Sequence, residues 1–294
     1  VKSGISENVV IEIMSTAKFL PKVIEYDRYQ PEFYEDTFTY ISKRSSKKKV
    51  KKGVLFYNKN KKIIDEIDAK FKIEKELLLA LMGIETNFGT YVGKMDILSS
   101  LSTLSFDKRR SEFFTKELIT VLQLVENNVI DHKSLYGSWA GAFGFFQFMP
   151  STINQYAIDY DNNNNIDLKD YQDSFASAAN YLKKMGWQQN GPCFVSVKLS
   201  SKTPDKYLNT SARKIKNKKK LKFFKKYLKD FDNSINENLL VGIITPDAEI
   251  VDNADIFNPA YLIFDNYELI LKWNRSLRFG LAVCTLKERF ENEL

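Results

Sequence analysis

Glu85 is the residue of this chain best placed for acid–base chemistry, because it lies in a stretch with otherwise apolar helical spacing. Residues 73–89 read IEKELLLALMGIETNFG, with apolar residues recurring as in a helix that buries one side. The helical neighbours of Glu85 include Leu81, Met82 and Phe88. Desolvation keeps a carboxyl protonated at higher pH, which suits a general acid. A surface carboxylate or a structural ion pair is the alternative, and this helix alone favours that alternative.

A second candidate is the amide of Gln147, which stands in the stretch GSWAGAFGFFQFMPSTINQYAID that begins at Gly137. Phe146 and Phe148 flank it directly. A buried amide needs hydrogen-bond partners, so Gln147 either satisfies the backbone or faces a polar ligand such as a sugar. Both alternatives stay open at this level.

Residues 159–170, DYDNNNNIDLKD, match the oxygen pattern of a calcium-binding loop. Ile166 is the expected apolar anchor at position eight. Asn164 replaces the usual glycine at position six, and an asparagine tolerates the left-handed conformation required there. We predict a structural Ca²⁺ site, with a merely polar loop as the alternative, and no organic cofactor. Positions one, three, five, seven, nine and twelve are Asp159, Asp161, Asn163, Asn165, Asp167 and Asp170.

Composition narrows the chemistry further. The chain has 294 residues, 44% of them hydrophobic, which allows one large domain or two to three small ones, and no apolar run is long enough to span a bilayer. The single histidine, His132, lies in a polar stretch, and Cys193 and Cys284 are far apart. Histidine-based triads and cysteine–zinc sites are therefore disfavoured, and the cysteines are expected to be free thiols by default, with one disulfide possible. The start, VKSGISENVV, lacks the pattern of a secretory signal.

The formal charge of +7 is concentrated in the lysine runs 47–52 and 214–226. Solvated faces are the simplest interpretation of such runs. Attraction to an anionic partner is the alternative, and single-strand nucleic acid is only a minor option.

The elements that must position these residues are mostly helices. Pro21 is expected to stop a first helix, residues 31–44 to form a loop, Pro150 to open a helix and Asp173 to cap another. Alternation predicts strands near 193–200 and 239–245 and a β-rich stretch at 260–273, and the lysine-rich stretch 214–231 is expected to be a surface helix. Further helices are predicted at 5–19, 54–71, 73–89, 97–104, 111–125, 174–187 and 275–290.

The stretch GIETNFG followed by GSWAGAFGFFQFMPST resembles the family B lytic murein transglycosylases, glycoside hydrolase family 103. The resemblance runs from about Val54 to the end and includes TLSFDKRRSEFF, the 159–170 loop, ANYLKKMGW and KWNRSLRFGLAV. It implies a mainly α (α+β) fold: a lysozyme-like helical core with an EF-hand-like calcium loop, a flanking helical region and a small β region. The expected domains are 1–66 plus 279–294, 67–187 plus 262–278, and 188–261.

The function implied by the resemblance is cleavage of peptidoglycan glycan strands between N-acetylmuramic acid and N-acetylglucosamine, with 1,6-anhydro ends. Glu85 would serve first as acid and then as base. A hydrolase of glycosides usually needs a second carboxylate, and Asp96, Asp107 and Glu112 all lie in polar contexts. A muramidase that uses water and a non-catalytic wall-binding module are the alternatives.

The resemblance also implies a binding groove and a location. Trp273 and Phe279 stand where the family often has tyrosine, and Tyr40 is a weaker groove candidate. The chain is expected to be a periplasmic monomer that has no nucleic acid as partner. A lipid anchor in the outer membrane and recruitment by other wall-remodelling proteins are left open. The lysine runs are hypothesised to attract anionic stem peptides. Groove positions are matched by Ser138, Gln147, Tyr181 and Asn274, with Arg110 beside them.

Overall fold

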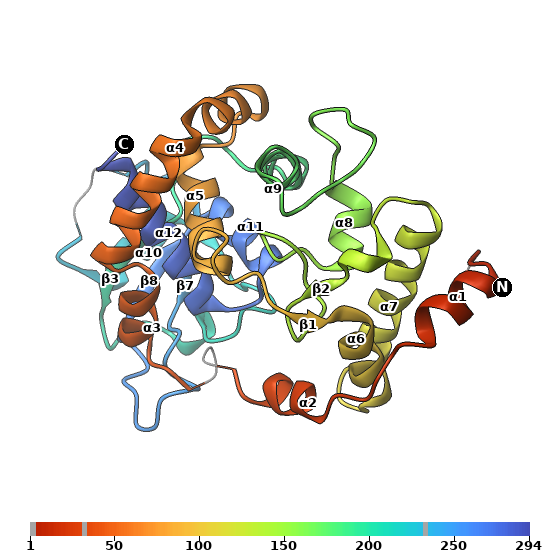
Figure 1. The fold of residues 1–294 in the computed structure, drawn as a ribbon. Helices are drawn as coiled ribbons and strands as arrows, with labels where there is room; N and C mark the ends of the chain where they lie inside the picture. The colour runs from red at the N-terminus through yellow and green to blue at the C-terminus, as the bar shows by residue number, and fades with distance from the viewer. Residues whose placement is uncertain (1–3, 31–33, 232–234) are drawn as a thin grey trace. The chain divides into compact units, whose positions relative to one another are not determined.

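Helices make up most of the fold, and apart from one two-residue pair the strands all lie in the C-terminal half of the chain (Figure 1). The computed structural model describes residues 4–30, 34–231 and 235–294. Within them, every helix is too short or too polar to cross a bilayer. This arrangement matches the expected mainly α (α+β) class. The α-helices are α1 Glu7–Met14, α2 Pro21–Arg28, α3 Thr37–Arg44, α4 Lys47–Phe71, α5 Lys75–Thr86, α6 Ile97–Phe106, α7 Ser111–Glu126, α8 Pro150–Tyr156, α9 Tyr171–Met185, α10 Leu221–Phe224, α11 Asp265–Trp273 and α12 Leu277–Glu291.

The strands are short, and they form one two-stranded and one six-stranded sheet. In the larger sheet the order is β4–β7–β8–β3–β6, with β5 also paired to β7. The strands are β1 Met95–Asp96, β2 Tyr136–Gly137, β3 Phe194–Leu199, β4 Leu208–Asn209, β5 Lys219–Lys220, β6 Leu228–Lys229, β7 Leu240–Ile244 and β8 Ala260–Ile263.

The chain divides into two compact units. Unit 1 comprises Val1–Gln30 and Phe56–Lys184, and unit 2 comprises Pro31–Leu55 and Met185–Leu294. The β-containing region expected at 188–261 falls within unit 2. The finer division into three domains stays a prediction.

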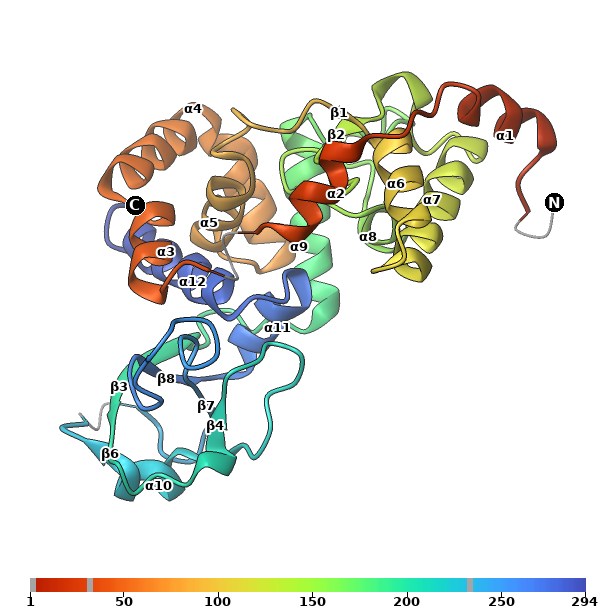
Figure 2. The ribbon, with the colours of Figure 1, turned by 90° about the horizontal axis from the view of Figure 1, so that it is seen from below.

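Unit 1 is helical and is built around α5, α6 and α7. Helices α6 and α7 pack side by side, with α2 against α6 and with α1 and α8 against α7 (Figure 2). The helix predicted at 111–125 is α7, and it buries Phe114, Val121 and Leu122. The first helix ends at Met14, and Pro21 is the first residue of α2 instead of a stop. Proline suits this position because its missing N–H would have no helical partner there.

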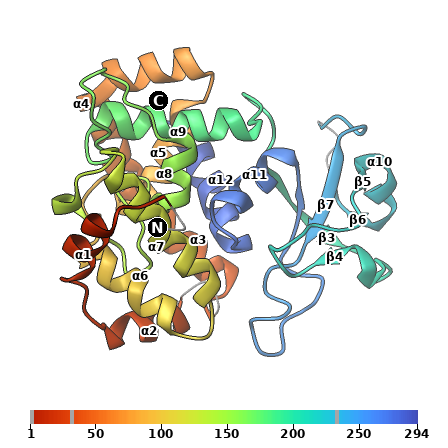
Figure 3. The ribbon, with the colours of Figure 1, turned by 90° about the vertical axis from the view of Figure 1, so that its right-hand side faces the viewer.

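Unit 2 combines the sheet with α3, α11 and α12. Its core contains Val241 and Leu262 from the sheet together with Leu221 and Phe224 of α10, which covers the strands (Figure 3). The lysine-rich stretch 214–231 is therefore not the surface helix that was predicted, because its apolar residues cover the sheet. The loop predicted at 31–44 is also wrong, since it contains α3; residues 31–33 lie outside the described part.

Two cysteines stabilise unit 2. Cys193, just before β3, forms a disulfide with Cys284 in α12, with the two Cα atoms 6.2 Å apart. The default expectation of free thiols is therefore wrong. The 91-residue separation between the cysteines carries no spacing signal, so only the tertiary fold reveals the pair.

Candidate active site

Helix α5 presents Glu85 at its C-terminal end, after seven consecutive buried residues at 77–83. The side chain of Glu85 is half-buried, between buried core and solvent. The chain then turns through Asn87, Phe88 and Gly89, whose φ angles of 51°, 59° and 73° are all left-handed. Gly89 is needed there because a Cβ would lie 2.9 Å from the ring of Phe145.

Thr86, the neighbour of Glu85, attaches this helix end to the Gln147 stretch. Its buried hydroxyl donates to the carbonyl oxygen of Phe145 at 2.8 Å and accepts from the backbone N–H of Gly89 at 3.1 Å. The position of the Glu85 backbone is thus fixed by a contact 59 residues away in sequence. No local pattern in the sequence indicates this role for Thr86.

The Gln147 stretch runs beside the segment that follows α5. Met95 pairs with Gly137, and a Cβ on Gly93 would lie 2.1 Å from the carbonyl oxygen of Gly137, so the two backbones are in close contact. Ser138 then closes a turn, with its hydroxyl accepting from the backbone N–H of Ala142 at 3.0 Å. These contacts bring the Ser138 turn next to the chain that leaves the Glu85 helix.

Gln147 has a left-handed backbone, with φ of 50°, and its amide nitrogen is satisfied by the backbone. Nε2 donates to the carbonyl oxygens of Gly144 at 2.8 Å and of Val92 at 3.2 Å. Of the two alternatives, the first therefore holds for the NH₂ group, which donates its hydrogen bonds to backbone carbonyl oxygens. Contact of its carbonyl oxygen with a sugar stays a prediction.

Tyr181 reaches the same stretch from α9. Its ring is 9% exposed, stacks on Tyr156 at 4.4 Å between centroids and meets Phe148 edge-on at 6.1 Å. Burial, assisted by Tyr156, raises the pKa of Tyr181 to about 12, so the hydroxyl keeps its proton. Four predicted site residues, Glu85, Ser138, Gln147 and Tyr181, thus lie on connected elements of unit 1.

Arg110 lies at the start of α7 and is engaged with protein groups. Its Nη1 is 3.4 Å from Oδ1 of Asp27, which is buried, and its guanidinium lies 4.9 and 4.8 Å from the ring centres of Phe113 and Phe114. The side chain retains about 41% exposure. Its role beside a groove stays a prediction.

Asn274 belongs to unit 2, where it is the C-terminal cap of α11. Its carbonyl oxygen accepts from the backbone N–H of Ser276 at 2.8 Å. The place of Asn274 in a binding groove stays a prediction. In the same unit Phe279 and Tyr40 are buried, and the guanidinium of Arg44 lies 3.5 Å from the Tyr40 ring centre.

The carboxylates that could rival Glu85 have structural partners. Asp96 caps α6 by accepting from the N–H of Ser99 at 2.6 Å. Asp107 forms an ion pair with Arg28 at 2.8 Å, and Glu112 is paired with Lys116 on its own helix. His132 is exposed, as predicted.

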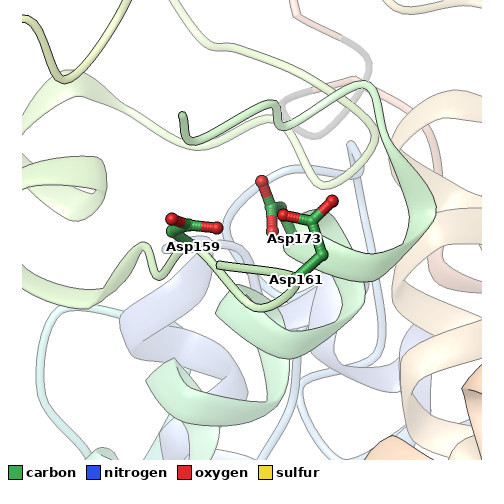
Figure 4. Close-up of side chains that lie close together, drawn as sticks. All are labelled: Asp159, Asp161 and Asp173. Carbon is green, nitrogen blue, oxygen red and sulfur yellow. The ribbon is translucent and has the colours of Figure 1, made fainter. Parts of the chain in front are cut away.

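The 159–170 loop gathers three carboxylates, from Asp159, Asp161 and Asp173, with one oxygen of each within 4.8 Å of the others (Figure 4). Asn164 adopts φ of 65°, which confirms the left-handed turn predicted at position six. Burial, with the nearby charges of Asp161 and Asp159, raises the pKa of Asp173 against the effect of two backbone hydrogen bonds. A divalent cation would relieve this crowding, so the donor set fits Ca²⁺.

Two acids at this site differ from their predicted roles. Asp173 is the buried member of the cluster, not the cap of α9, and sequence analysis missed it as a donor. Asp170 takes the capping position instead, accepting from the N–H of Gln172 at 2.6 Å. Asp170 and Asp173 have the Asp-x-x-Asp spacing of a helix start, and this signal could have indicated that Asp170 caps α9 and that Asp173 lies in its first turn. The ligand set Asp159, Asp161, Asn163, Asn165 and Asp170 stays a prediction.

Comparison with known proteins agrees with this geometry. Residues 1–288 match the family model described as "Transglycosylase SLT domain". The membrane-bound lytic murein transglycosylase B of Escherichia coli (strain K12) is 35% identical over 196 residues, 63% of this chain. The match spans 54%, about half, of that relative's own length.

Solved structures show the same fold. SltB3 from Pseudomonas aeruginosa, in complex with NAG-NAM-pentapeptide, is 28% identical with a TM-score of 0.84, over 99% of this chain and 76% of that one. The lytic transglycosylase Slt35 of Escherichia coli, in complex with calcium, is 27% identical with a TM-score of 0.80, over 99% of this chain and 89% of that one. The resemblance inferred from the motifs is thereby confirmed: this chain belongs to the transglycosylase SLT domain family, with the lytic murein transglycosylases of family B.

Proposed function

We propose that this protein is a lytic transglycosylase of peptidoglycan that cleaves the β-1,4 bond between N-acetylmuramic acid and N-acetylglucosamine. One observation carries the proposal: Glu85 lies half-buried at the end of a buried helix, and Thr86 beside it joins that helix end to the Gln147 stretch. The peptidoglycan fragment bound by SltB3 supports the same substrate class.

A single carboxyl can carry both steps. Glu85 first gives its proton to the glycosidic oxygen, and the bond from that oxygen to C1 of the muramic residue breaks. The resulting carboxylate then accepts the proton of the C6 hydroxyl as O6 bonds to C1, which closes the 1,6-anhydro ring. Glu85 ends the cycle protonated. No water enters, so the second carboxylate typical of glycoside hydrolases is not required.

The strand is proposed to lie along the Gln147 stretch. The carbonyl oxygen of Gln147 and the hydroxyls of Ser138 and Tyr181 offer polar contacts to sugars on elements connected to α5. Asn274 and Arg110 are proposed to complete the binding residues. The hydroxyl of Tyr181, which keeps its proton, can both donate and accept a hydrogen bond.

The products distinguish this proposal from its alternatives. Mass spectrometry of digested, purified wall is expected to find 1,6-anhydro ends. Reducing ends would instead identify a muramidase that uses water, and an absence of any released product would identify a non-catalytic wall-binding module. The membrane-bound relative supports a periplasmic site of action, and a lipid anchor in the outer membrane belongs to the same proposal.

Replacing Thr86 by Val is expected to lower both stability and turnover. The substitution removes the hydroxyl between Phe145 and Gly89 and leaves a partly buried N–H and carbonyl oxygen without it, at a cost of about 1 kcal/mol. Urea unfolding measures the loss, and the rate of wall cleavage reports whether Glu85 has shifted. Thr86→Ser, which keeps the hydroxyl, is the matched control. Equal losses in both variants would contradict the positioning role.

Calcium is proposed to stabilise the 159–170 loop by binding the native state. At a free concentration 100 times the dissociation constant, the expected gain is about 2.7 kcal/mol in the free energy of unfolding. Thermal unfolding in excess calcium and in chelator measures it. Asp173→Asn is expected to abolish most of the difference, whereas Asp205→Asn, an exposed acid outside the loop, should retain it. Identical melting temperatures for the native chain in the two conditions would refute calcium binding.

A further inference from the structure

The net positive charge of the chain comes from one segment of unit 2, because the lysine run 47–52 is balanced by acids elsewhere in the chain. Residues 198–237, here the basic segment, hold thirteen lysines and arginines and four acids, a net charge of +9. The remaining residues hold 31 basic and 33 acidic side chains, a net charge of −2. The charge of +7 is therefore a local property, and it concentrates any attraction for anions on this part of unit 2.

Most of these cations are exposed. Only Lys218 and Lys225 are half-buried, and each is in an ion pair: Lys218 with Asp265 and Glu268, and Lys225 with Glu237. For the others, no ion pair occurs among the residues that the structure describes. These eleven exposed cations are Lys198, Lys202, Lys206, Arg213, Lys214, Lys216, Lys219, Lys220, Lys222, Lys226 and Lys229.

Two of the exposed lysines lie opposite each other on neighbouring strands, which is unfavourable for a sheet. Lys198 of β3 and Lys229 of β6 stand directly opposite each other in the antiparallel register. Like charges at such positions destabilise a sheet. The repulsion between these two lysines lowers stability, and the fold itself does not require it. Such a cost is typical of a functional surface, and here a bound anion would remove the repulsion.

The side chains around these cations indicate the kind of anion. Twelve of the thirteen cations are lysines, which act as flexible point charges and lack the fork of arginine that recognises phosphate in a fixed geometry. Tyr207 is buried in the core of the sheet region, and Phe223 and Tyr227 are half-buried against that core. Among the described residues of the basic segment, no large apolar side chain is exposed. Base stacking and insertion into a membrane therefore have no side chains here to support them.

We propose that the basic segment is a second, non-catalytic binding surface for peptidoglycan, which attracts the carboxylates of stem peptides and so retains the enzyme on its insoluble substrate. The choice of peptidoglycan as partner rests on the proposed function. The surface itself is independent of Glu85, because its cations all belong to unit 2 and Glu85 belongs to unit 1.

The test compares two variants that each lose six exposed lysines to Gln. Both leave the ion-paired Lys218 and Lys225 in place. Binding to sedimented peptidoglycan, stripped of attached polymers, is measured over a range of salt concentrations. One variant replaces Lys198, Lys216, Lys219, Lys220, Lys222 and Lys229 in the basic segment, and the control replaces Lys22, Lys48, Lys59, Lys62, Lys108 and Lys133 elsewhere.

The basic-segment variant is expected to bind about tenfold more weakly than the control at low salt, with the difference lost at high salt. Amidation of the stem-peptide carboxylates should weaken binding of the native chain to the same level. Equal binding by the two variants, or undiminished binding to amidated wall, would overturn the proposal. So would a charge-dependent affinity confined to vesicles of anionic phospholipid, which would identify a membrane surface instead.

Cleavage of a short soluble glycan separates this inference from the proposed function. The basic-segment variant is expected to release product from it at the native rate, because the catalytic groove is unaltered. If the native chain releases no product while the difference in wall binding persists, the proposed function fails and the binding surface stands.

Discussion

Replacing Glu85 by Gln is expected to lower the rate of wall cleavage by about 10³-fold or more while binding of the wall is retained. General acid–base catalysis contributes about 10²–10⁴-fold to a rate, and here one carboxyl would perform both proton transfers. Gln has nearly the same shape but no proton to give to the leaving oxygen. The measurement is the rate of release of anhydro products from purified wall, alongside sedimentation of the variant with that wall.

Glu112→Gln is the matched control for this experiment. Glu112 lies on an exposed helix face and is paired only with Lys116 at 2.7 Å. Its loss is expected to leave turnover unchanged, since an exposed pair contributes little to stability. If Glu85→Gln retained activity within about tenfold of the native chain, equivalent to about 1.4 kcal/mol of barrier, Glu85 would not be the catalyst.

The difference between Glu85 and its rivals was only partly visible in the sequence. The helical period of 73–89 predicts α5, and the buried face of that helix is confirmed at Leu77 and Leu81. Helical periodicity, however, predicts only the face of the helix on which a side chain lies, and not the groups that it contacts. What distinguishes Glu85 is its place beside the Gln147 stretch, which is fixed by the hydrogen bond from Thr86 to Phe145, 59 residues away in sequence. A contact of that range has no local signal.

Errors in the predicted elements have a common physical cause. Lysine is a good helix former, so the stretch 214–231 has the propensity and charge of a surface helix. In the fold, Leu221 and Phe224 are fully buried against the sheet of unit 2, and only four residues remain α-helical. Burial of apolar area outweighs a propensity difference of a few tenths of a kcal/mol per residue.

The 159–170 loop illustrates the reverse case, in which local chemistry was informative but incomplete. The alternation of oxygen-bearing side chains located the loop, and the tolerance of Asn164 for a left-handed backbone was confirmed. Asp173 was not predicted as a metal ligand, because the calcium-loop template aligned on residues 159–170 ends at Asp170. Its carboxylate reaches the cluster from the first turn of α9, where it also accepts from the backbone N–H groups of Tyr160 and Asp167.

Replacing Asp247 by Ala is expected to destabilise unit 2 by about 3–5 kcal/mol, the largest stability effect predicted for this chain. The buried carboxylate accepts from Nη2 of Arg278 at 2.7 Å and from the N–H and hydroxyl of Thr37 at 3.0 and 2.5 Å. It thereby joins the start of α3 to the first turn of α12. Without it the guanidinium of Arg278, itself only 2% exposed, loses the charge that compensates its burial. Urea unfolding, monitored by circular dichroism, measures the loss.

The double variant Asp247→Leu with Arg278→Met tests the cause of that loss. Two apolar side chains remove both charges together, so the double variant is expected to be more stable than Asp247→Ala, although one charge more has been deleted. A double variant less stable than the single would show that the ion pair itself, and not the uncompensated guanidinium, supplies the stability. Asn274 ends α11, and Arg278 follows it four residues later in the first turn of α12, which Ser276 caps. Wall cleavage by the double variant therefore also reports whether this pair positions the predicted groove residue Asn274.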